Sequence, residues 1–183
     1  MIDKKIPFVG LHAHSVAGSI FDAIGYPDEH MDFCYENGGE ALALTDHGNM
    51  NGFSHQFLHW QKMKDEGKEF KPIFGVEAYF LPSIEEWRDD YDRIKEDKKL
   101  AKSLAKQGDT SGATVEDEDA SKKAIKSVIN RRRHLVLLAQ NQTGLNNLFK
   151  LISASYREEN FYRYPRVDYK MLAEHSEGVI AAS

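Results

Sequence analysis

Four short apolar runs, each typical of a β-strand, carry a histidine or a glutamate. The first ends in His12-Ala13-His14, and residues i and i+2 of a strand point to the same face, so both imidazoles can reach one metal ion. The second run ends at His47, the third contains Glu77, and the fourth begins at His134. Imidazole and carboxylate ligands on separate strands are typical of zinc or manganese sites.

The runs alternate with helical segments. We expect strands at 6–12, 41–45, 72–81, 135–139 and 178–182, and helices at 27–37, 51–66, 143–156 and 168–175. We expect Thr143 to cap the helix that it begins. Repeated strand–helix units predict a parallel sheet in an α/β protein, with a closed or partly closed barrel as one way to build it.

Residues 83–133 interrupt this alternation, and about half of them are charged. We expect a charged helical hairpin inserted between the third and fourth strands, with a mobile tip near 107–119. A solvated surface excursion and a docking arm for a partner or for nucleic acid both remain open. Arg131, Arg132 and Arg133 at its base are candidate phosphate contacts, as are Arg163 and Arg166 among aromatic residues further on.

Composition narrows the classes of protein to which this chain can belong. The 183 residues suit one domain, and no stretch is long and apolar enough to cross a membrane. A single cysteine excludes an internal disulfide, and the N-terminus lacks the apolar core of a secretion signal, so we expect a cytoplasmic protein. The net charge of −5 means that any contact with nucleic acid is local.

Together these motifs resemble the polymerase-and-histidinol-phosphatase (PHP) family. The resemblance lies in the His12-x-His14-Ser15 motif and in segments 42–49, 72–77 and 134–139. It extends to segments 161–168 and 174–181, which are less typical of the stand-alone phosphatases of this family. Gly48-Asn49 and the last two segments are closest to the version that opens the alpha subunit of bacterial DNA polymerase III, a C-family replicative polymerase. The resemblance implies a distorted, TIM-like (β/α)7 barrel, and we expect residues 1–183 to form a partial PHP domain.

The resemblance also implies a site for up to three zinc, manganese or iron ions. Further family ligands, a cysteine or histidine and a distal Asp-x-His pair, are absent from this sequence, so we expect a fragment of a longer protein, with its barrel incomplete at the C-terminus. Asp46 is expected to support the site without binding metal. The implied catalytic residues are His12, His14, His47 and Glu77, and the implied metal ligands are His12, His14, Asp22, His47, Glu77 and His134.

Three functions follow from this resemblance. The first is a metal-dependent phosphoesterase within a replicative polymerase, acting as a 3'–5' exonuclease or on pyrophosphate, with DNA, the rest of the alpha subunit and other replisome subunits as partners. The second is a stand-alone phosphatase of a small phosphomonoester. The third is a catalytically silent scaffold that stabilises a polymerase or docks a partner through residues 83–133.

Overall fold

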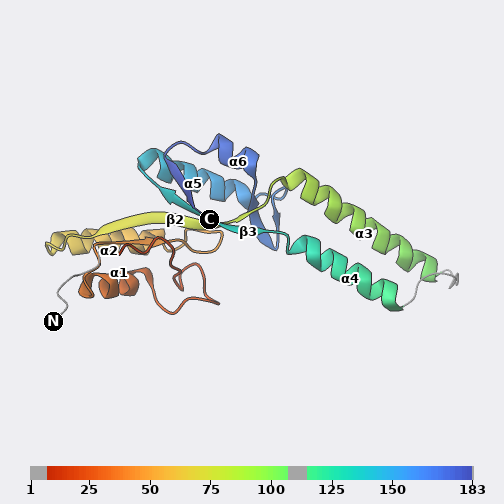
Figure 1. Ribbon diagram of the computed structural model, residues 1–183, viewed down its shortest axis with the longest axis horizontal. Helices are drawn as coiled ribbons and strands as arrows, with labels where there is room; N and C mark the ends of the chain where they lie inside the picture. The colour runs from red at the N-terminus through yellow and green to blue at the C-terminus, as the bar shows by residue number, and fades with distance from the viewer. Residues whose placement is uncertain (1–7, 107–114, 183) are drawn as a thin grey trace.

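The computed structural model describes residues 8–106 and 115–182, which form a six-stranded sheet with helices on both sides (Figure 1). The helices are α1 (Pro27–Glu36), α2 (Phe53–Asp65), α3 (Ile84–Lys106), α4 (Val115–Ile129), α5 (Gln142–Ser155) and α6 (Tyr169–Glu174). The strands are β1 (Ala41–Leu44), β2 (Lys71–Phe80), β3 (Arg133–Ala139), β4 (Phe161–Tyr162), β5 (Tyr164–Val167) and β6 (Val179–Ala182). No described helix combines the length and apolarity that crossing a membrane requires.

The longest strand, β2, organises the sheet. The first four residues of β2 pair in parallel with β1, and its last two pair in parallel with β5. On its other edge, the second half of β2 pairs with β3. The strand order is β4-β5-β2-β3-β6, with β1 beside β2. Within the described residues the sheet stays open and does not close into a barrel.

The sheet is mixed, so the expectation of a purely parallel sheet was wrong. Strand β3 runs antiparallel to β2, and β6 runs antiparallel to β3. The cause is the charged segment: α3 leads away from the end of β2 and α4 leads back, so β3 starts where β2 finished (Figure 1). A connection that returns to the same end of a sheet produces an antiparallel pair, whereas a crossover helix would have produced a parallel one.

Helices α3 and α4 lie side by side and extend away from the sheet (Figure 1). These two helices fall within residues 83–133, for which the sequence predicts a helical hairpin. Of the expected tip, residues 107–114 lie outside the described residues, and 115–119 already belong to α4.

Two apolar clusters hold the elements together. The larger packs α5, α6 and the bases of α3 and α4 against the sheet, and the smaller packs α1 and α2 against β1. Alternation along β2 decides which face each residue occupies: Val76 and Ala78 are in the larger cluster, so Glu77 and Tyr79 face the opposite side. The side of β2 away from α5 is therefore the polar one.

Two local expectations need correction. Residues 8–12 of the first expected strand form no strand and make only an isolated bridge, Gly10 with Leu42, while residues 6 and 7 lie outside the described residues. The helix expected to be capped by Thr143 is capped by Asn141, whose side chain accepts a hydrogen bond from the Gly144 backbone N–H at 2.9 Å. Asparagine is among the best N-cap residues, so the helix begins one residue earlier.

Candidate metal centre

The segment before β1 carries His12 and His14 alongside that strand. The carbonyl of Gly10 accepts a hydrogen bond from the Ala43 N–H, and that of Ala13 accepts one from the Thr45 N–H, each at 2.8 Å. These bonds hold the segment extended even though it is not a regular strand. The two histidine Nε2 atoms lie 3.1 Å apart, which is the juxtaposition that the His-x-His spacing predicts.

Glu77 is the centre around which the histidines gather. Its side chain is only 3% exposed. Oxygen Oε2 lies 2.8 Å from His14 Nε2, 3.1 Å from His12 Nε2 and 3.0 Å from His47 Nδ1. Oxygen Oε1 lies 2.5 Å from His134 Nδ1. One buried carboxylate is therefore shared by four imidazoles.

Backbone register explains why His47 faces Glu77. The chain beyond β1 continues along β2, so that Glu77 N–H donates to the Asp46 carbonyl at 3.0 Å and Gly48 N–H donates to the Glu77 carbonyl at 2.8 Å. These bonds form an isolated parallel bridge between His47 and Glu77. Gly48 has φ of +64°, a left-handed conformation that favours glycine and turns the chain away directly after His47.

Asp22 completes the cluster from the loop before α1. Its Oδ2 lies 2.6 Å from His47 Nε2 and 3.6 Å from His14 Nδ1. All six predicted ligands are thus together, in three overlapping triads whose ligand atoms lie within 4.8 Å of one another. The triads are His12–His14–Glu77, His14–Asp22–His47 and His47–Glu77–His134.

The donor set fits divalent metal ions. Nitrogen and carboxylate oxygen ligands suit zinc, manganese and iron, which was the expectation from the sequence. His47 Nδ1 is buried and lies 3.0 Å from Glu77 Oε2 without forming a well-oriented hydrogen bond to any described residue, which leaves this nitrogen available as a metal ligand. Burial alone would raise the pKa of the Glu77 carboxyl, but hydrogen bonds with His12 and His134 and the charge of His47 together lower it. Glu77 is therefore held as a carboxylate, the form that binds metal.

Asp46, for which the sequence predicts a supporting role, directly precedes His47. It is 3% exposed, and its carboxylate accepts hydrogen bonds from Ser15 N–H at 2.6 Å, Ser15 Oγ at 2.8 Å and Ser19 Oγ at 2.9 Å. Ser19 Oγ in turn accepts from His47 N–H at 3.0 Å. Asp46 thus fixes the backbone on either side of the ligands.

We expect Asp46→Ala to lower the free energy of unfolding by about 3 kcal/mol, because it leaves three buried donors without an acceptor. Urea unfolding followed by circular dichroism measures this loss. Asp65→Ala, at an exposed position at the end of α2, is the matched control and should change stability by no more than about 0.5 kcal/mol. Equal effects of the two substitutions would contradict the role given to Asp46.

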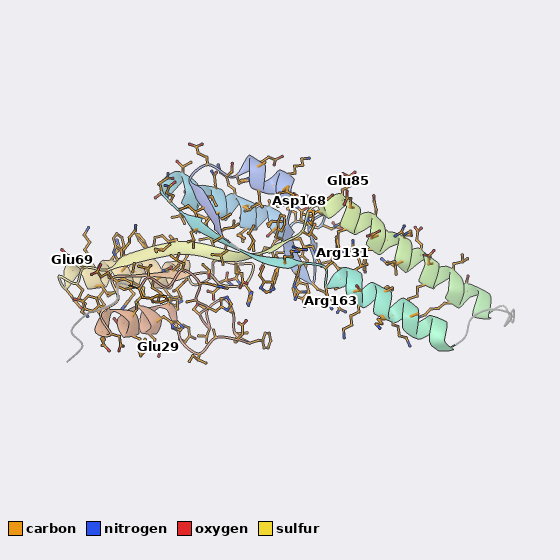
Figure 2. The ribbon with its side chains drawn as sticks, in the orientation of Figure 1. Glu29, Glu69, Glu85, Arg131, Arg163 and Asp168 are labelled. Atoms are coloured by element: carbon orange, nitrogen blue, oxygen red, sulfur yellow. The ribbon has the colours of Figure 1, made fainter. Side chains whose placement is uncertain are left out.

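The five predicted phosphate-contact arginines lie in different environments, near the junction of the sheet with α3 and α4, where Figure 2 labels Arg131 and Arg163. Arg131 pairs with Asp90 at 2.6 Å, while Arg133 and Arg163 are exposed. The guanidinium of Arg132 stacks on Tyr164, with its carbon 3.8 Å from the ring centre.

Arg166 cannot be a phosphate contact, and this expectation was wrong. Its side chain is fully buried, and its guanidinium donates hydrogen bonds to the carbonyls of Tyr162, Tyr164 and Ile129 at 2.8, 3.1 and 2.6 Å. It also stacks on Trp87, at 3.9 Å from the ring centre. Every strong contact of this cation is made inside the protein.

Sequence reasoning missed two neighbours of the cluster. The ring of Tyr79 is stacked parallel to that of His47 at 5.8 Å and meets His134 edge-on at 5.4 Å. His30 of α1 lines a cleft of about 300 Å³ together with His12, His14 and Asp22. Tyr79 lies two residues after Glu77 on a strand, and this spacing could have placed it on the same face as the cluster. No such signal exists in the sequence for His30, a lone histidine on a helix. A separate cleft of about 1170 Å³ between α3, α5 and α6 contains none of the cluster.

Comparison with known proteins identifies the family and several relatives of this chain. The sequence profile of the PHP domain matches residues 10–183. The DNA polymerase III alpha subunit of Aquifex aeolicus is 33% identical over 174 residues, which is 95% of this chain and 12% of that protein. Those of Treponema pallidum and Saccharopolyspora erythraea are 34% and 32% identical over 98% and 97% of the chain, and 12% and 13% of their own lengths. The chain thus spans about an eighth of the length of these relatives.

Proposed function

Because the chain belongs to the PHP domain family, we propose that it is the N-terminal PHP region of a DNA polymerase III alpha subunit and carries a multi-metal phosphoesterase site. The polymerase itself, a DNA-directed nucleotidyltransferase, would lie outside these residues. The proposed reaction is hydrolysis of a phosphate ester, of the 3'–5' exonuclease or pyrophosphatase type. The proposed partners are the rest of the alpha subunit, DNA and other replisome subunits.

The observation that carries this proposal is the grouping of six ligand side chains, among them four imidazoles that contact the buried carboxylate of Glu77. They come from four separate stretches of the chain, between His12 and His134, and still lie in three triads of metal-binding size. A structural core histidine needs a partner for each ring nitrogen but does not need to share it with other histidines, whereas here four histidines share Glu77. Such sharing of one buried carboxylate favours catalysis over the scaffold alternative, which needs no ligands.

We propose a separate task for each part of the cluster. Metal ions bound there would activate a water molecule and polarise a phosphoryl oxygen. Glu77, buried in the sheet, would fix the centre of the site, and His12 and His14 would form its outer wall, since His12 is about half exposed. Asp22 would complete the site from the loop before α1, and Asp46 would hold that loop in place through Ser15 and Ser19.

Metal content tests the proposal directly. We expect the chain purified without chelator to hold two or three equivalents of zinc, manganese or iron by mass spectrometry. The double substitution His12→Ala/His14→Ala should lose most of this metal, because it removes ligands from two of the three triads. Release of nucleotides from the 3' end of primed DNA should be lost in parallel.

The matched control is His55→Ala/His59→Ala, which removes two histidines from α2 without touching any of the triads. It should retain the metal content of the unmodified chain. Metal that persists in the His12/His14 variant, or metal absent from every protein, would refute the proposed site. Cleavage of small phosphomonoesters but not of DNA would favour the phosphatase alternative.

A further inference from the structure

One cation beside the cluster has no ionic partner among the residues that the structure describes. Of the three consecutive arginines, Arg131 is paired with Asp90, whereas Arg132 is within ion-pair distance of no described carboxylate. Its one hydrogen bond is long, 3.4 Å to the Asn130 carbonyl, and its buried Nε has no hydrogen-bond partner among the described residues. A guanidinium held in this state keeps most of its hydrogen-bonding capacity for a ligand.

Two tyrosines hold this guanidinium in place. Its carbon lies 3.8 Å from the ring centre of Tyr164 and 5.2 Å from that of Tyr79, and the two rings meet at 5.2 Å. Cation–π contacts of this kind fix the position of an arginine without neutralising its charge. Arg132 is therefore both positioned and unneutralised.

The same tyrosine connects Arg132 to the proposed metal centre. Tyr79 lies opposite His134 in the β2–β3 register, and its ring is parallel to that of His47 at 5.8 Å. Arg132 precedes His134 by two residues, so in extended backbone the two side chains point to the same face. The cation therefore lies one aromatic ring away from the histidine–carboxylate cluster, on the same side of the sheet.

We propose that Arg132 binds a phosphate group of a nucleic-acid strand, next to the phosphate at the cluster, with Tyr79 and Tyr164 as the residues that position it. This inference rests on the proposed function and specifies its substrate: a strand with at least two phosphates, in place of a small phosphomonoester. A guanidinium offers a planar fork of donors that matches two phosphate oxygens, which makes arginine well suited to this task.

Binding of a fluorescent twelve-nucleotide oligothymidylate, followed by anisotropy at several salt concentrations, tests the proposal. Arg132→Met keeps an unbranched side chain on the tyrosine rings and removes the charge. We expect it to weaken binding about tenfold and to reduce the slope of log affinity against log salt by about one. Arg132→Lys should restore the slope but not the full affinity, because lysine lacks the fork.

Arg157→Met is the matched control, since it removes an arginine charge at an exposed position for which no stacking on a described tyrosine is found. It should change affinity less than twofold. The inference fails if Arg132→Met binds like the unmodified chain, or if Arg157→Met weakens binding equally. Metal content separates this result from the proposed function. If Arg132→Met weakens binding in a chain that holds no metal, the phosphate contact is supported and the metal centre is refuted. If the chain holds metal but Arg132→Met has no effect, the metal centre is supported and the phosphate contact is refuted.

Discussion

Replacing Glu77 with glutamine is expected to abolish metal binding, because Glu77 belongs to two of the three triads and contacts four histidines. The amide is nearly the same size but carries no charge and offers one oxygen where the carboxylate offers two. Metal content by mass spectrometry should fall to background, and any hydrolysis of DNA should be lost with it.

Thermal unfolding gives a second readout that does not depend on activity. A ligand at a hundred times its dissociation constant stabilises the folded state by about 2.7 kcal/mol. Added zinc or manganese should therefore raise the melting temperature of the unmodified chain and leave that of Glu77→Gln unchanged. Glu40→Gln, an exposed glutamate just before β1, is the control and should respond like the unmodified chain. An equal response of all three would show that the metal binds elsewhere.

The second large effect concerns stability. Replacing Arg166 with alanine is expected to lower the free energy of unfolding by about 3–5 kcal/mol, because three carbonyls lose a charged donor in a region closed to water. Burial lowers the pKa of Arg166 to about 10, so the side chain is still charged at neutral pH and every one of these bonds is charge-assisted. The loss would be a large part of the stability of an ordinary domain.

Urea unfolding of Arg166→Ala beside Arg133→Ala measures this effect. Arg133 is an exposed arginine of the same sheet, and its substitution should cost no more than about 0.5 kcal/mol. A stable Arg166→Ala variant that had lost only oligonucleotide binding would reverse our assignment. It would return Arg166 to the group of phosphate contacts.

The sequence predicted the candidate site better than it predicted the sheet. Every proposed ligand lies at the end of an apolar run, inside one or in a loop between them, and the motif resemblance supplied their grouping; the structure brings all six together. The antiparallel direction of β3 could not be predicted, because the alternation of strands and helices does not show at which end of the sheet a long insertion returns. The direction depends on α4 running back alongside α3, so that β3 begins where β2 ends.

The arginines show a different limit. Arg166 and Arg163 occupy the same aromatic-rich stretch, yet one is fully buried and the other exposed. Strands β4 and β5 and the tight turn between them, in which Arg163 has φ of +60°, decide which side each residue faces. Charge patterning assigns both residues to the surface, because it does not anticipate a cation that satisfies three carbonyls at the base of a hairpin.

Residues 8–26 are held in the fold by different interactions from those that hold the rest of the molecule. This segment contains no helix or strand of its own, and Phe8, Ile20, Phe21 and Ile24 are mostly exposed. Polar atoms hold it: backbone bonds to β1, the Asp46 carboxylate, and the imidazoles around Glu77. Apolar burial, which secures the helices, contributes little here. Because this segment carries His12, His14 and Asp22, assembly of the cluster depends on polar contacts as much as on the apolar core that secures the helices.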